Sequence, residues 1–169
     1  RIARLVDTGS AGVMLIRGEP GIGKSCLLQV AAAMARKANT RLFKASAFES
    51  EMIRPFGVWK DALQRGLPVN SAARQLLDSG EQLTREQVFT GLTEIFRVEV
   101  QKNPVVVLCD DIQWADACSF SAVQFLLRNH PKLPVLFIVA SREFELRDHP
   151  GAQSVFRNLR KDQLLEDIH

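Results

Sequence analysis

The sequence predicts an α/β fold in three layers, with helices on both faces of a mainly parallel sheet. Strand-like and helix-like segments alternate along the 169 residues. The central strand candidates are continuously apolar, which is typical of strands buried on both faces. Glycine-rich or polar motifs follow three of these strands, where ligands bind in such sheets.

The order of elements follows from apolar periodicity and from helix start and stop signals. Thr84 and Gln87 form a capping box, and Asp116 is suited to N-cap a helix. In the helix after residue 24, Leu27, Ala31, Met34 and Ala38 fall on one face. The predicted strands cover residues 13–17, 41–48, 105–109, 134–140 and 164–168. The predicted helices cover residues 25–38, 55–64, 84–102, 116–129 and 150–161, with a shorter one around 72–78.

Composition indicates one globular domain, residues 1–169. Because the sequence does not begin with Met, we expect it to be a piece of a longer, cytoplasmic protein. The chain is 46% hydrophobic and 24% charged, with a net charge of +3. Its longest apolar run, residues 133–140, is too short for a membrane span, which needs ~20 residues. Basic residues are scattered, so no DNA-binding face is expected. Cys26, Cys109 and Cys118 lack metal-ligand spacing and are expected to be reduced, buried thiols.

The stretch GEPGIGKS, residues 18–25, fits the phosphate-loop pattern G-x-x-x-x-G-K-[ST] between a strand and a helix. Backbone amides of such a loop and the helix N-terminus cradle phosphates. We therefore expect a P-loop NTPase fold in which Lys24 reaches the β- and γ-phosphates of ATP and Ser25 ligates Mg²⁺. The predicted nucleotide contacts in this region are Gly18, Glu19, Pro20, Gly21, Ile22, Gly23, Lys24, Ser25 and Cys26.

The stretch VVVLCDDIQWADACS, residues 105–119, ends an apolar strand in two carboxylates. Asp110 is expected to hold Mg²⁺ opposite Ser25. Asp111 is placed to orient or deprotonate an attacking water, and the alternative is that it caps the following turn. Trp114 is expected in the core rather than stacked on a cofactor. Asp116 is expected to be an N-cap, with a role near the phosphates as the alternative.

A third strand, in PVLFIVASRE, ends at Ser141 and Arg142. If this strand is central, Ser141 would bond to the water or the γ-phosphate, and Arg142 would pair with the γ-phosphate. The alternative for Arg142 is a surface ion pair with Glu143 or Glu145. The late-strand Asn-Lys-x-Asp motif of GTP recognition is absent, which favours ATP.

GEPGIGKS, LCDDIQWADACS and VLFIVASRE, in this order, resemble the STAND signal-transduction ATPases within the AAA+ and related P-loop ATPases. RPFGVWKDAL, residues 54–63, is similar to a segment that these proteins carry after their second strand. The nearest resemblance is to the ATPase domains of bacterial LuxR-type transcriptional regulators and of some cyclase-linked regulators. It implies a five-stranded sheet in which the strands before Asp110 and Arg142 neighbour the phosphate-loop strand.

The resemblance also implies a switch that is active with ATP and closed with ADP, in a protein whose further domains contact DNA. Nucleotide-dependent self-association would accompany the switch, and no membrane contact is expected. Fast AAA+ motors are expected to carry Glu where Asp111 stands, so hydrolysis is expected to be slow. The alternatives are an initiator- or loader-type ATPase acting on DNA, the regulatory ATPase of a cyclase-linked protein, and a scaffold that only binds nucleotide.

Overall fold

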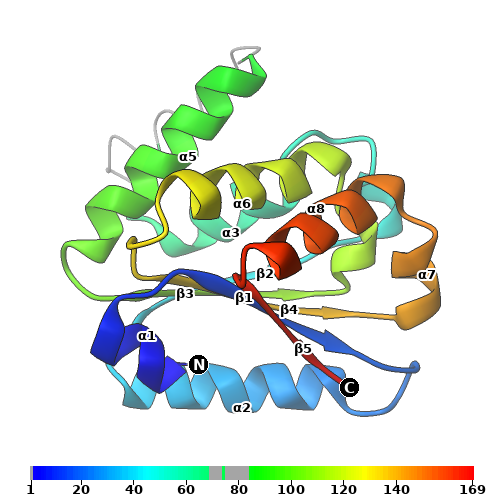
Figure 1. Cartoon of the computed structure of the whole chain (residues 1–169), viewed down its shortest axis with the longest axis horizontal. Helices are drawn as coiled ribbons and strands as arrows, with labels where there is room; N and C mark the ends of the chain where they lie inside the picture. Colours follow the sequence, from blue (N-terminus) through cyan, green and yellow to red (C-terminus); the bar gives the residue numbers. More distant parts are fainter. Residues whose placement is uncertain (1, 69–73, 75–83) are drawn as a thin grey trace.

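A five-stranded, wholly parallel sheet forms the centre of the molecule in the computed structural model, which describes residues 2–68, 74 and 84–169 (Figure 1). Every pair of adjacent strands runs parallel. The strand order is β2-β3-β4-β1-β5. The strands are β1 (Gly12–Arg17), β2 (Arg41–Ser46), β3 (Val105–Asp110), β4 (Val135–Ser141) and β5 (Leu165–Ile168). The predicted α/β fold class and its five strands are confirmed.

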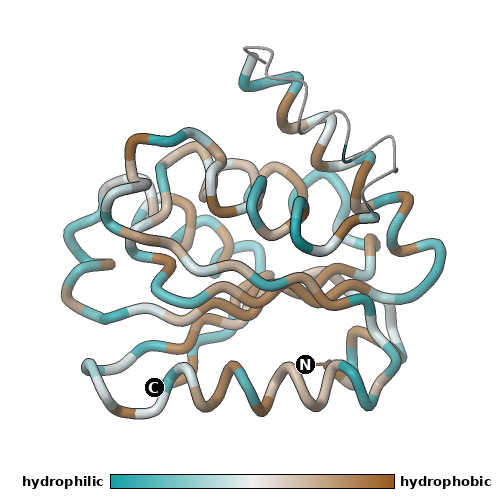
Figure 2. Tube along the Cα trace, turned by 180° about the vertical axis from the view of Figure 1, so that it is seen from behind, coloured by the Kyte–Doolittle hydropathy of each residue, from teal (hydrophilic) through white to brown (hydrophobic). Residues whose placement is uncertain are grey.

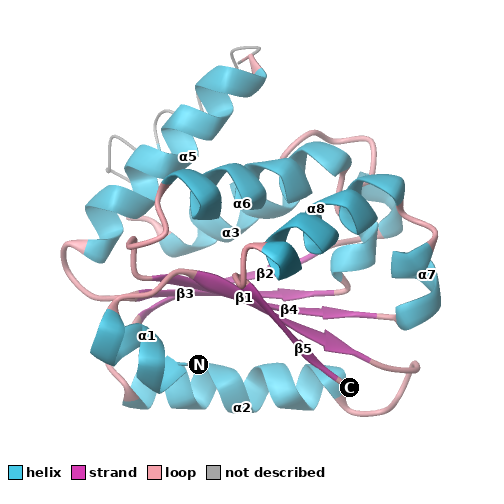
Figure 3. Ribbon diagram, viewed as in Figure 1, coloured by secondary structure: helices cyan, strands magenta, loops and turns pink. Residues whose placement is uncertain are grey.

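Helices cover both faces of the sheet, as Figure 3 shows. On one face lie α1 (Ile2–Thr8) and α2 (Lys24–Lys37). The other face is covered by α3 (Gly57–Gly66), α5 (Arg85–Val100), α6 (Ala117–Asn129) and α8 (Pro150–Lys161), and α7 (Glu143–Arg147) lies at the edge of the sheet. None of the helices in the described ranges is long and apolar enough to cross a membrane.

The position of β4 corrects one expectation about the sheet. β4 pairs with β1 on one side and with β3 on the other, so it lies between the strand of the phosphate loop and the strand of Asp110. The expectation that the Asp110 strand directly neighbours the phosphate-loop strand is therefore wrong, whereas the central placement considered for the Arg142 strand is confirmed. The end of β4 thus lies between the two motifs.

Two hydrophobic layers explain why the strands are apolar on both sides (Figure 2). Alternate residues of the three inner strands, β1, β3 and β4, enter one layer or the other, as Val107 and Leu108 of β3 do. The larger layer, beneath α3, α5, α6 and α8, contains the ring of Phe137, whose centroid lies 5.5 Å from that of Trp59 and 5.9 Å from that of Phe96. The continuous apolar runs in the sequence are the consequence of this double burial.

The buried face of α2 differs from the predicted one. Leu28, Ala32 and Ala35 pack under the sheet. Leu27 and Met34 of the predicted face are 49% and 56% exposed. Both faces of α2 carry apolar residues at helical spacing, so periodicity alone did not identify the inner one.

Helix boundaries follow local signals, with shifts that have physical causes. Thr84 and Gln87 form the predicted capping box, with the two reciprocal hydrogen bonds at 2.8 and 3.3 Å. α3 begins at Gly57 rather than at residue 55, because Phe56 takes a left-handed conformation with φ 59°. The short helices α1 and α7 were not predicted. The predicted helix around 72–78 lies outside the continuously described residues.

Candidate nucleotide site

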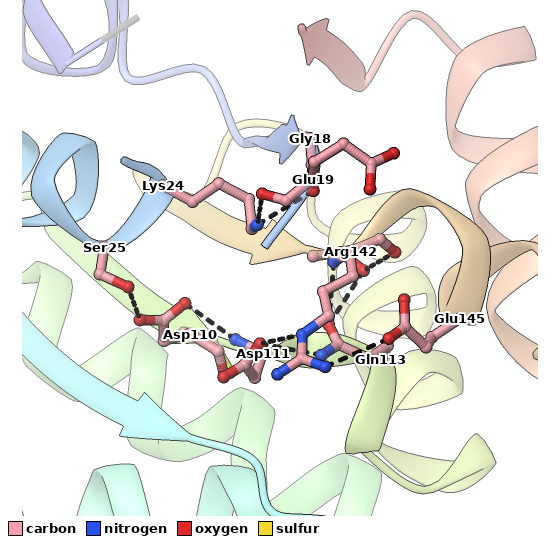
Figure 4. A network of polar contacts seen from close by, with 11 residues as sticks. Gly18, Glu19, Lys24, Ser25, Asp110, Asp111, Gln113, Arg142 and Glu145 are labelled. Carbon is pink, nitrogen blue, oxygen red and sulfur yellow. Dashed lines mark hydrogen bonds and ion pairs between the residues drawn. The ribbon is translucent and has the colours of Figure 1, made fainter. Parts of the chain in front are cut away.

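The carboxyl ends of β1, β3 and β4 meet at one edge of the sheet and bring the three sequence motifs together (Figure 4). Residues 18–23 connect β1 to α2, and the last two residues of the phosphate-loop motif, Lys24 and Ser25, begin that helix. Asp110 ends β3, and Ser141 ends β4. Residues that are far apart in the sequence therefore converge here because parallel strands place their ends on the same side.

Glycine geometry shapes the phosphate loop, in which the N–H of Ile22 donates to the carbonyl oxygen of Glu19 at 3.3 Å. Gly21 and Gly23 have φ values of 81° and 103°, a region that residues with a Cβ rarely adopt. Gly23 caps α2 without a side-chain hydrogen bond, so among the described residues no capping side chain covers the first turn of the helix. The N–H groups of this turn and the positive end of the helix are suited to hold an anion such as a phosphate.

Lys24 is folded back over this loop. Its side chain is 8% exposed, and Nζ donates hydrogen bonds of 2.9 Å to the carbonyl oxygens of Gly18 and Glu19. Two uncharged carbonyl oxygens thus hold the ammonium group at the loop. A phosphate bound in the loop would offer the ammonium group a negatively charged acceptor. This position fits the predicted role of Lys24, which remains a prediction.

Ser25 and Asp110 form the most direct link between the two halves of the site. The Ser25 Oγ donates a hydrogen bond of 2.6 Å to Asp110 Oδ2, across 85 residues of sequence. A hydroxyl and a carboxylate oxygen at this distance are the hard donors that Mg²⁺ prefers, and Mg²⁺ uses few protein ligands because it keeps several waters. Ser25 and Asp110 therefore fit a magnesium ion, which would neutralise phosphate charge when bound.

Asp111 turns the chain sharply after β3. It has φ 51° and ψ 42°, and it precedes a short 3₁₀ turn, η2 (Ile112–Trp114). Its side chain makes no capping bond to that turn. Instead, Oδ1 accepts a hydrogen bond of 2.8 Å from Gln113 Nε2 and lies 3.7 Å from Arg142 Nε. The carboxylate is 39% exposed, so it faces the open edge of the site.

Arg142 lies between two carboxylates. Its Nη1 is 3.2 Å from Glu145 Oε1, and its Nε is 3.7 Å from Asp111. The surface pair considered in the sequence is therefore present with Glu145, while Glu143 lies 3.6 Å from Arg17. The guanidinium is also beside Asp111, as Figure 4 shows, so a phosphate bound at this edge would compete with Glu145 for it.

Ser141 is fully buried, and its hydroxyl is occupied. Its Oγ donates to Gln113 Oε1 at 3.1 Å and lies 3.0 Å from the carbonyl oxygen of Arg142. In this arrangement the hydroxyl points into the protein rather than to the phosphate loop. Gln113, which sequence reasoning assigned no role, therefore joins Ser141 to Asp111. No local signal marks it, because a glutamine in a short turn has no distinctive pattern.

Trp114 and Asp116 have structural roles. Trp114 is partly buried and packs on the larger hydrophobic layer. Asp116 is 8% exposed, and its carboxylate accepts bonds from the backbone N–H groups of Cys118, Ser119 and Phe56 at 2.9, 3.0 and 3.0 Å. It is the predicted N-cap of α6, and it also fixes the segment before α3.

The cysteines differ in exposure. Cys109 is buried in β3, and burial, followed by the charges of Asp110 and Asp111, raises the pKa of its thiol well above the usual range. Cys26 is exposed at the start of α2 and Cys118 is partly buried, so the expectation of buried thiols is wrong for Cys26 and holds in full only for Cys109. Glu19, Pro20 and Ile22 of the loop are also exposed, Ile22 at 71%.

A phosphate loop facing a strand-end aspartate on one edge of a parallel sheet defines a nucleotide-binding domain of the P-loop class. Residues 1–138 match the model of the AAA ATPase domain family, and the chain belongs to that family. Comparison with curated protein sequences gave no match.

Solved structures show the same fold in larger proteins. A DNA replication initiation factor matches with a TM-score of 0.54 at 18% identity, over 99% of this chain and 43% of that one. The replication initiator DnaA bound to AMPPCP and single-stranded DNA matches with 0.54 at 19% identity, over 99% and 43%. AMPPCP-bound DnaA from Aquifex aeolicus matches with 0.50 at 20% identity, over 99% and 44%. This chain thus spans less than half the length of those proteins, and the likeness concerns the fold.

Proposed function

We propose that the chain is an ATP-binding, slowly hydrolysing switch domain of a multidomain signalling protein of the STAND class, such as a LuxR-type transcriptional regulator. The contact of Ser25 with Asp110 at 2.6 Å carries the proposal, because it joins the phosphate loop to the strand-end acid in one potential magnesium site. Contacts with DNA are proposed for other domains, and self-association for the ATP-bound state.

Each site residue has a proposed part in the reaction. The loop amides and Lys24 would bind the phosphates, and Ser25 and Asp110 would hold Mg²⁺. Asp111 would orient the attacking water. Arg142 would pair with the γ-phosphate and return to Glu145 once that phosphate has left, which would report the nucleotide state.

The geometry around Asp111 supports slow turnover. The side chain of Asp111 is one methylene shorter than that of the glutamate expected at this position in fast AAA+ motors, so the water that it orients would lie less favourably. A water-positioning group that is misplaced by about 1 Å can cost on the order of 10²-fold in rate. A slow reaction suits a switch, because the ATP-bound state then persists long enough to act.

Calorimetry and single-turnover hydrolysis test this function. The wild type should bind ATP more tightly with Mg²⁺ than without it and hydrolyse it slowly. Lys24→Ala should lose affinity, and Asp111→Asn should bind ATP but hydrolyse it more slowly. A wild type that binds ATP without hydrolysing it would favour the nucleotide-binding scaffold, and no binding at all would refute the proposal.

An initiator- or loader-type ATPase acting on DNA is the other candidate. The fold is shared with DnaA, whose structure was determined with single-stranded DNA. The pattern around Asp110, Trp114 and Asp116 is the observation that makes the signalling switch preferable. Turnover that rises on addition of single-stranded DNA to the 169-residue chain would reverse this preference.

A further inference from the structure

We propose that Gln113 is a positioning residue for hydrolysis, which orients the carboxylate of Asp111 and ties it to the end of β4. The proposal rests on the proposed ATPase function and assigns a role to a buried side chain that is not itself one of the predicted phosphate- or metal-binding groups. Gln113 would act only through Asp111.

Gln113 uses both ends of its amide inside the protein. The side chain is 1% exposed. Its Nε2 donates to Asp111 Oδ1 at 2.8 Å, and its Oε1 accepts from Ser141 Oγ at 3.1 Å and from the backbone N–H of Arg142 at 3.2 Å. A buried amide with donor and acceptor satisfied on opposite sides has a fixed orientation, because rotating it would leave polar groups unpaired. Figure 4 shows it beside Asp111 and Arg142.

Asp111 has few other restraints on its side chain. Its backbone N–H donates to Asp110 Oδ1 at 3.0 Å, which fixes the main chain but not the carboxylate. The approach of Arg142 Nε at 3.7 Å is too long for a hydrogen bond. The Gln113 bond engages Oδ1, and no described residue donates a hydrogen bond to Oδ2. Oδ2 is therefore the oxygen left to accept a hydrogen bond from water.

The same amide connects Asp111 to the strand that carries Arg142. Because Gln113 Oε1 accepts from both Ser141 and the N–H of Arg142, a shift of this strand end would move the acceptor side of the amide. The Nε2 group at the other end of the amide would move as well, and the Asp111 carboxylate to which it donates would change orientation. Engagement of Arg142 by a phosphate and positioning of the water would thus be linked through one side chain.

A double-mutant cycle separates this role from a merely structural one. Gln113→Met keeps the length of the side chain and removes its hydrogen bonds. Single-turnover hydrolysis should fall by about tenfold or more, since a misplacement near 1 Å costs on the order of 10²-fold. The ATP dissociation constant should stay within about twofold of wild type. In an Asp111→Asn background, Gln113→Met should cause no further loss, because the group it positions is already disabled.

Two further variants keep the test decisive. Gln113→Asn retains the amide but is one methylene too short to bond Asp111 and β4 together, so it should slow hydrolysis even if the Met variant folds poorly. Gln124→Met on α6, a glutamine outside the site, should hydrolyse ATP at the wild-type rate. Thermal unfolding of each variant checks that folding is unaffected.

The outcomes distinguish this inference from the proposed function. Wild-type hydrolysis, slowed in Asp111→Asn but unchanged in both Gln113→Met and Gln113→Asn, would overturn the role of Gln113 alone. Losses that multiply in the double variant, or a fall in ATP affinity that accounts for the lower rate, would also overturn it. No hydrolysis by the wild type would overturn the proposed hydrolysis and this inference with it. Full activity of Asp111→Asn would overturn the roles of Asp111 and Gln113 but leave the ATPase function standing.

Discussion

Replacing Asp116 by alanine should lower the free energy of unfolding by about 2–4 kcal/mol, on two physical grounds. The first is the loss of the N-cap of α6, where bonds to the backbone N–H groups of Cys118 and Ser119 contribute about 1 kcal/mol. The second is the N–H of Phe56, which would lose its acceptor in a partly buried place at a cost of about 1–3 kcal/mol.

Urea denaturation followed by Trp fluorescence measures this change, with calorimetry as a second measurement. For a chain of this size each kcal/mol corresponds to about 2–4 °C in Tm, so Asp116→Ala should melt roughly 4–16 °C below the wild type. Thr84→Ala is the matched control, because Thr84 caps α5 at an exposed position and should cost only about 1 kcal/mol.

The reasoning fails if Asp116→Ala unfolds within error of the Thr84→Ala control. It also fails if Asp116→Ala keeps wild-type stability while losing affinity for ATP. The second result would assign Asp116 to the nucleotide instead of to the joint between α6 and the start of α3.

Three further predictions follow from single contacts. Lys24→Ala should weaken Mg²⁺·ATP binding by about tenfold or more in calorimetry, because one charge-assisted contact is worth about 1.5–3 kcal/mol; an unchanged affinity would contradict the role of Lys24. The hydrogen bond from Arg160 lowers the pKa of Asp167. The ionised carboxylate therefore stabilises the fold at pH values above the usual aspartate pKa of about 3.9, and this stabilisation is lost as the pH falls below that value. The stability deficit of Asp167→Asn should accordingly be present at pH 7 and shrink toward pH 3 in urea titrations, and a deficit independent of pH would exclude this origin. Under native conditions a thiol reagent should label Cys26 but leave Cys109 unmodified until denaturant is added, as mass spectrometry of the labelled peptides would show.

The parts of the site that could be predicted are those encoded by contiguous residues. The order of glycines before Lys24 and Ser25 identifies the loop because the backbone there needs φ values that only glycine adopts readily. The position of Asp110 at a strand end could be predicted because an apolar run ending in an acid is a local pattern. The contact between Ser25 and Asp110 then follows from the parallel sheet, which aligns the ends of β1 and β3.

The parts that could not be predicted depend on packing between distant segments. Gln113 is hydrogen-bonded to Ser141 at the end of β4, 28 residues away, and no pattern in the residues next to Gln113 indicates that contact. The inner face of α2 was misassigned because Leu27 and Leu28 are equally apolar and only the sheet decides which is buried. The strand order was only partly predicted, since it depends on which connections cross over the sheet.

The left-handed backbone of Asp111 limits which residues can replace it. At φ 51° glycine, asparagine and aspartate are tolerated far better than other residues, and glutamate is not among them. Asp111→Glu would therefore combine a longer carboxylate with a strained main chain, and its rate could not be attributed to chain length. Asp111→Asn preserves both the shape and the turn, which makes it the substitution that reports on charge alone. In this chain the aspartate meets two independent requirements, one from the reaction proposed for it and one from the geometry of the turn.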